Sequence, residues 1–182
     1  ILSELASIRD AMSGGVGDVA VIFFAGHGYL DDDEKFYLCP YAVNNSSAAA
    51  LEASALAATD FHDKVARLAK YGRAVLFLDA CRSGGATNPL DRSLHAMFAA
   101  PNLAVFTSSA ASEDSIDVCL GNGAFTEALL EALKHPGADR NGLIRVSDLS
   151  RYLSTRIPSL TAGKQRPEVE VHFETQLFVS MQ

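Results

Sequence analysis

Cysteine is scarce in this sequence, which has 3 in 182 residues. Cys39, Cys81 and Cys119 are odd in number and show no C-x-x-C spacing, which fits neither a disulfide framework nor a cysteine-based zinc site. The simplest interpretation is a reducing compartment, so we expect a cytoplasmic protein.

Long apolar runs and clusters of basic residues are also missing. No stretch approaches the ~18 apolar residues of a membrane-spanning helix, and the first basic residue, Arg9, comes too late for a secretory signal. With a net charge of −7 and no run of Lys or Arg, the chain is expected to bind neither nucleic acid nor a membrane. Its length and its 48% hydrophobic content indicate a single globular domain over residues 1–182.

The sequence does contain two apolar runs that end in chemically capable residues. Val19–Ala25 is followed by Gly-His-Gly, a predicted turn with His27 in the middle, and Ala74–Leu78 is followed by Asp79 and Cys81. Apolar runs of this length, bounded by turn signals, are typical of buried strands. A predicted helix between them makes a right-handed crossover. The two strands are therefore expected to be parallel and to bring His27 and Cys81 to one edge of the sheet.

A histidine beside a cysteine is chemically useful because the thiolate, not the thiol, is the nucleophile. A thiol with the ordinary pKa of ~8.5 is mostly protonated at neutral pH, and a neighbouring imidazole favours the anion. Gly84 and Gly85 let main-chain N–H groups turn toward an oxyanion, and Gly28 could supply another donor. Either the histidine or the cysteine alone is more often structural, but together they favour catalysis. We interpret Cys39 as core filler and Cys119 as a loop thiol.

Two acidic stretches raise the question of a metal site. The four acids Asp31–Glu34 could hold a cation, but such runs are usually hydrated loops. Residues 139–148 are too few for a calcium-binding loop and have their glycine too early, so we interpret them as a turn before a helix capped by Ser147. We therefore expect no metal.

Further elements surround the two central strands. Periodicity and turn signals predict helices over 2–12 and 123–133, a helix capped by Thr59 or Asp60 that ends near Gly72, a surface excursion over 44–50, a third core strand over 102–107 and a final edge strand over 169–173.

The two motifs also resemble those of a known family. Ala-Gly-His-Gly around His27, and Leu-Asp-Ala-Cys-Arg-Ser-Gly around Cys81, are similar to the catalytic motifs of caspase-like cysteine peptidases, which include caspases, paracaspases, metacaspases and orthocaspases. The similarity continues through 102–117 and 121–130 and so covers nearly the whole chain. It implies an α/β fold, a caspase-like three-layer sandwich whose mainly parallel sheet is flanked by helices.

The resemblance implies roles for individual residues. Cys81 would be the nucleophile and His27 the general base, and the main-chain N–H groups of Gly28 and Cys81 would form the oxyanion hole. Asp79 stands where caspases have glutamine, and Asp117 aligns with their pocket arginine. Carboxylates there would attract Arg or Lys, as in metacaspases and paracaspases. No cofactor is implied, and the sequence does not show whether calcium activates the domain.

Other assignments are open for some of these pocket residues. Asp79 could instead cap local N–H groups at the end of its strand. Glu113 or Asp114 could take the place of Asp117 if the loop contains gaps. Ser115 and Ile116 would offer main-chain groups to an extended peptide.

The family pattern also divides the chain. Residues 1–82 and 102–182 would correspond to the large and small subunits, and the linker 83–101, a predicted mobile loop, contains Arg92 as a candidate self-cleavage site. Family members have a strand and helix before the region that matches Ile1, so an upstream segment or a partner chain is expected to complete the fold. The predicted function is an endopeptidase cutting after Arg or Lys. A catalytically silent scaffold is the main alternative, and hydrolysis of a small amide or ester is a third.

Overall fold

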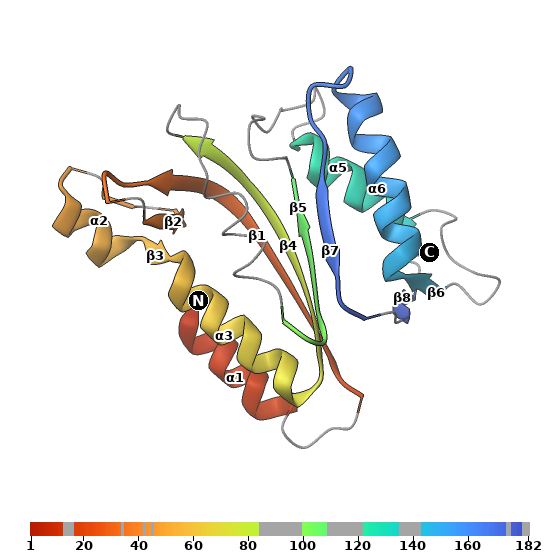
Figure 1. Cartoon of the computed structure of the whole chain (residues 1–182), viewed down its shortest axis with the longest axis horizontal. Coiled ribbons are helices and arrows are strands. Elements are labelled where there is room, and N and C mark those ends of the chain that lie inside the picture. The colour runs from red at the N-terminus through yellow and green to blue at the C-terminus, as the bar shows by residue number, and fades with distance from the viewer. Residues whose placement is uncertain are drawn as a thin grey trace.

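A computed structural model describes residues 1–12, 17–33, 35–41, 43–44, 46–83, 100–108, 122–134, 143–173 and 176–179; of residues 81–83, 143 and 176–179 only the backbone is described. The described part of the chain contains both helices and strands (Figure 1). In chain order they are α1 (Leu2–Met12), β1 (Val19–Leu30), β2 (Phe36–Cys39), α2 (Ala48–Ser54), β3 (Leu56–Ala57), α3 (Ala58–Tyr71), β4 (Arg73–Ser83), β5 (Leu103–Thr107), α5 (Ala124–Lys134), β6 (Leu143–Arg145), α6 (Val146–Leu160), β7 (Glu168–Val171) and β8 (Gln176–Val179).

Six strands form the main sheet in the order β3-β2-β1-β4-β5-β7. The central strands β1, β4 and β5 are parallel to one another, whereas β2 runs antiparallel to β1 and β7 antiparallel to β5. Since β3 is antiparallel to β2, it runs with the central three, so most strands share one direction. Strands β6 and β8 form a separate antiparallel pair.

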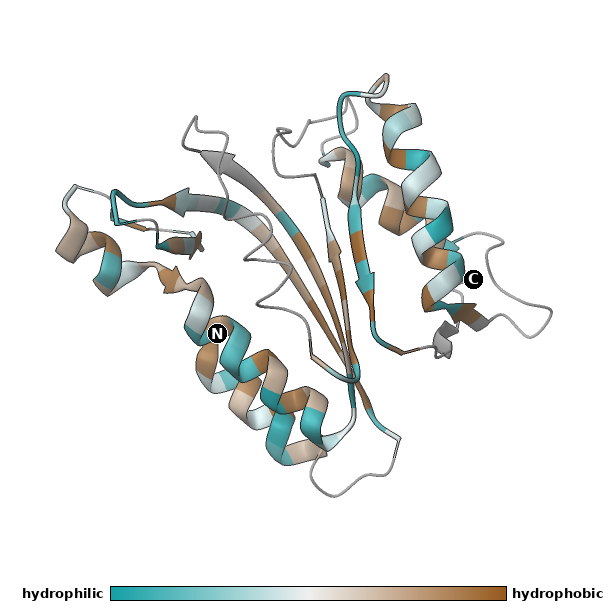
Figure 2. Ribbon diagram, viewed as in Figure 1, coloured by the Kyte–Doolittle hydropathy of each residue, from teal (hydrophilic) through white to brown (hydrophobic). Residues whose placement is uncertain are grey.

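Alternation along β4 divides the core into two layers. Leu76 and its even-numbered neighbours pack with α1 and α3, whereas Val75 and Phe77 pack with α5 and α6. The two helix pairs accordingly lie on opposite sides of the sheet in Figure 1, and apolar colour follows the central strands in Figure 2. This arrangement confirms the predicted α/β three-layer sandwich.

Several predicted boundaries were wrong for local reasons. The 44–50 excursion is partly helix α2, because Ser47 caps it by accepting a hydrogen bond from Ala50 N at 3.2 Å and three alanines favour helix. Helix α3 begins at Ala58, before the predicted caps Thr59 and Asp60, and α6 is preceded by Arg145 rather than capped by Ser147. Strand β7 is at the edge of the sheet, as predicted.

None of the described helices is long and apolar enough to span a bilayer.

A buried polar network joins the end of β5 to the segment after α6. Gln165 has no exposed surface, and its Nε2 donates a hydrogen bond to the carbonyl oxygen of Ser108 at 2.6 Å. Its main-chain N–H donates to Thr161 Oγ1 at 3.1 Å, and Ser108 N–H donates to Leu78 O at 2.9 Å. The network therefore ties β4, β5 and the C-terminal region together.

We expect Gln165→Leu to lower the free energy of unfolding by about 1–3 kcal/mol, because it takes a hydrogen bond from a buried carbonyl. Urea denaturation measures this change. Lys164→Leu, at an exposed neighbour, is the matched control and should leave the midpoint nearly unchanged. Equal midpoints for the two variants would contradict the importance of the network.

Candidate active site

The central pair of strands places the two candidate catalytic residues side by side. In the parallel register of β1 and β4, His27 is opposite Cys81 and Ala25 is opposite Asp79. Adjacent strands are about 4.8 Å apart, so the two backbones are neighbours. The predicted convergence is thus found at the level of the backbone, because strand, helix and strand form the expected crossover.

The His27 side chain is open to solvent. Odd-numbered positions of β1 from Val21 to His27 are exposed, whereas Ala20 and Phe24 on the other face are buried under α1 and α3. A substrate could therefore approach the imidazole from the face of the sheet that α1 and α3 do not cover.

Register alone allows a second thiol near His27. Cys39 of β2 is opposite His27 on the other side of β1. Burial raises the pKa of the half-buried Cys39 thiol above its ordinary value, which favours the protonated, poorly nucleophilic form. This supports the interpretation of Cys39 as a packing residue and leaves Cys81 as the better nucleophile candidate.

The glycines around His27 lie inside a strand. Strand β1 continues to Leu30, so the predicted turn at Gly26-His27-Gly28 is wrong and the chain reverses after Asp31. A Cβ on Gly26 would lie 3.0 Å from the carbonyl oxygen of Cys39 and 3.1 Å from the Phe24 ring. Glycine there therefore avoids tight contacts between the strands and does not serve an unusual φ. Gly28 is buried in register between Leu38 and Arg82.

The Asp79 side chain points toward helix α5. It is half-buried, and its Oδ2 accepts a hydrogen bond from Thr126 Oγ1 at 2.5 Å. Thr126 lies in the first turn of α5, next to Phe125, whose fully buried ring packs 6.5 Å from that of Phe77. Sequence reasoning missed Thr126, since nothing local connects it to a strand 47 residues earlier.

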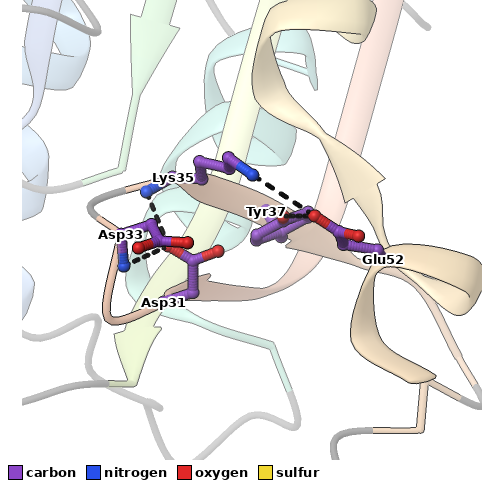
Figure 3. A network of polar contacts seen from close by, with 5 residues as sticks. All are labelled: Asp31, Asp33, Lys35, Tyr37 and Glu52. Atoms are coloured by element: carbon purple, nitrogen blue, oxygen red, sulfur yellow. Dashed lines mark hydrogen bonds and ion pairs between the residues drawn. The ribbon is translucent and has the colours of Figure 1, made fainter. Parts of the chain in front are cut away.

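The acidic run after β1 has a structural role (Figure 3). Asp31 Oδ1 accepts hydrogen bonds from the main-chain N–H groups of Asp33 at 3.0 Å and Lys35 at 2.8 Å. Lys35 Nζ lies 3.3 Å from Glu52, which also accepts from Tyr37 at 3.5 Å. Burial, with the nearby carboxylates of Asp31 and Glu52, raises the pKa of the Tyr37 hydroxyl. Asp31 thus holds the β1–β2 turn, and no group of three potential metal ligands occurs in the described part of the chain.

Several predicted site residues lie outside the described residues: Arg92, Ser115, Ile116 and Asp117, together with Glu113 and Asp114 as alternatives to Asp117. Gly84, Gly85 and Cys119 also lie outside them.

The family model of the caspase domain matches residues 1–179, nearly the whole chain. The chain belongs to the caspase domain family. Its similarity to this family supports a peptidase of the cysteine type and a protein or peptide as substrate.

Solved structures show a similar fold. Among 22 matching chains is protein GSU0716 from Geobacter sulfurreducens, with 15% sequence identity and a TM-score of 0.60 over 99% of this chain and 76% of that one. At this identity the likeness concerns the fold alone. A comparison with curated proteins found no match to this chain.

Proposed function

We propose that the chain is a cysteine endopeptidase that cleaves after Arg or, less often, Lys, with His27 and Cys81 as its catalytic pair. The observation that carries this proposal is the register that puts His27 opposite Cys81 on adjacent parallel strands. Paired positions of neighbouring strands share a face of the sheet, which is the relation that an imidazole and a thiol need for proton transfer.

In the proposed reaction, His27 takes the thiol proton of Cys81 while sulfur attacks the peptide carbonyl carbon. Collapse of the tetrahedral intermediate breaks the C–N bond, and the imidazolium gives its proton to the leaving amine. Water, with His27 again as base, then hydrolyses the thioester, which releases the acid and restores the thiol. The main-chain N–H groups of Gly28 and Cys81 remain the predicted donors to the oxyanion.

We assign the preference for Arg or Lys before the scissile bond to carboxylates of the chain. Asp79 is half-buried two residues before Cys81 in the same strand, where a bound guanidinium or ammonium group would find a charged partner with little competition from water. Asp117 is proposed as the second acid, and Ser115 and Ile116 as main-chain contacts of the peptide. We also retain Arg92 in the linker as a self-cleavage site and a cytoplasmic location as predictions.

An irreversible peptide probe with arginine next to its reactive group tests this proposal. We expect mass spectrometry to find the probe on Cys81 and on no other cysteine. Cys39 is the internal control, because burial disfavours its thiolate. Labelling of Cys81→Ala to the same extent would contradict the assignment of the nucleophile, and no labelling of the unmodified chain would favour the scaffold alternative. In a separate preparation without the probe, an intact chain that is fully active would contradict self-cleavage at Arg92.

One observation favours the scaffold alternative, in which the domain is catalytically silent and serves to bind a partner. In the described part of the chain, Val19–Gly26 pair only with β4, because β2 begins to pair at His27. On the same stretch Val21 is 45% and Phe23 47% exposed. Open strand edges and exposed apolar side chains mark surfaces where another segment docks. We propose that an upstream segment or a partner chain completes the sheet here.

We expect the 182-residue chain alone to self-associate through this edge, and the double variant Val21→Lys, Phe23→Lys to reduce that association. Light scattering across a concentration series measures the effect. Tyr71→Lys, at a residue that is 50% exposed on α3, is the control and should associate like the unmodified chain. Equal association of both variants would show that the β1 edge is not involved.

A further inference from the structure

The hydrogen bond between Thr126 and Asp79 joins two parts of the molecule that the proposed reaction needs in fixed positions. Asp79 is on β4, two residues before Cys81. Thr126 is in the first turn of α5, which follows the linker 83–101 in the sequence. Their side chains meet at 2.5 Å in a partly buried setting. Helix α5 thus contacts the strand that carries the proposed specificity acid, close to the proposed nucleophile.

The start of α5 is itself held firmly. Phe125 has no exposed surface and packs against Phe77, which precedes Asp79 by two positions on the same strand. Asn122 Nδ2 donates to Glu127 at 3.1 Å, which closes the first turn of the helix. A threonine has two staggered choices for its hydroxyl in a helix, and here the choice is the one that reaches Asp79. Packing of Phe125 and the Asn122–Glu127 bond thus hold the helical turn that carries the Thr126 donor.

We propose that Thr126 is a positioning residue that orients the Asp79 carboxylate toward the basic side chain of the substrate. This inference rests on the proposed function. An ionised carboxylate has about four acceptor positions and can accept from several donors at once, so the bond from Thr126 can help to fix the rotamer of Asp79 and is compatible with a guanidinium bound to the same group. Without the donor, the carboxylate loses one of the contacts that hold its rotamer, and the cost of restoring that orientation weakens binding of basic substrates alone.

Matched peptides with Arg or norleucine before the scissile bond test this proposal on Thr126→Val and Thr126→Ser. Valine keeps the shape but removes the donor, whereas serine keeps the donor. We expect Thr126→Val to raise KM for the Arg peptide about tenfold, with kcat and the norleucine peptide nearly unchanged, and Thr126→Ser to restore most of the difference. In the background of Asp79→Asn, Thr126→Val should have little further effect on the Arg preference.

The outcomes separate the two proposals. If Thr126→Val leaves the Arg preference of an active chain unchanged, the hydrogen bond is only structural. The same conclusion follows if Thr126→Val lowers the melting temperature and slows hydrolysis of both peptides equally. If valine prevents folding, Thr126→Ala provides the same comparison with a smaller side chain. An unmodified chain that hydrolyses neither peptide would overturn the proposed function itself, and the role of Thr126 with it.

Discussion

Replacing Cys81 with alanine should lower kcat for an Arg peptide by about 10⁴-fold or more, and His27→Ala should have an effect of similar order. The thiol forms the bond to carbon and the imidazole moves the proton in each half of the reaction, so neither residue works without the other. For this reason the double variant should be no slower than Cys81→Ala alone. Initial rates with a fluorogenic peptide, at saturating and at low substrate, provide both kcat and kcat/KM.

Cys39→Ala is the matched control for this experiment. It removes a thiol from the strand on the other side of His27, in register with the same histidine. Because burial raises the pKa of Cys39, its loss should leave kcat within a few fold of the unmodified chain. If Cys39→Ala inactivates the chain while Cys81→Ala remains active, the nucleophile is Cys39 on β2, and our assignment of it to Cys81 on β4 is wrong.

The central part of the fold could be predicted because it depends on local signals. The apolar runs of β1 and β4 are strand-like by themselves, and the amphipathic helix between them fixes the hand of the crossover. From parallel strands the shared edge follows, and so does the pairing of His27 with Cys81. The length of these strands was underestimated, since glycine ordinarily ends a strand, whereas Gly26 continues β1 by allowing β2 to approach closely.

The features that were missed depend on contacts between distant segments. The bond from Thr126 to Asp79 results from the packing of α5 on β4, and the helical pattern of α5 predicts only that Phe125 and its neighbours face the core. For the acids after β1, the sequence favours a hydrated loop over a cation site but does not show which acid holds the turn. The structure shows Asp31 holding the turn through two main-chain donors.

Asp79 illustrates how the two kinds of information combine. Its position two residues before Cys81 is visible in the sequence, and so is the alternative that it caps local N–H groups. The structure adds a contact that the sequence does not reveal, a hydrogen bond from the Thr126 side chain on helix α5. A hydroxyl donor such as Thr126 orients a carboxylate without supplying a charge of its own, which is compatible with recognition of a cation.

The charge of Asp79 should decide the selectivity between basic and neutral substrates. We expect Asp79→Asn to lower kcat/KM for an Arg peptide by about a hundredfold and to leave a norleucine peptide within a few fold, because a guanidinium held in a half-buried site loses its charged partner. Asparagine has the same shape, and its carbonyl oxygen can still accept from Thr126, so the α5 contact is retained while the charge is removed. Asp63→Asn, an exposed acid on α3, is the control for the change in net charge and should not alter the ratio. If Asp79→Asn keeps the full preference for arginine, the selectivity must come from another acid, and Asp79 would then serve only to hold α5 against the sheet.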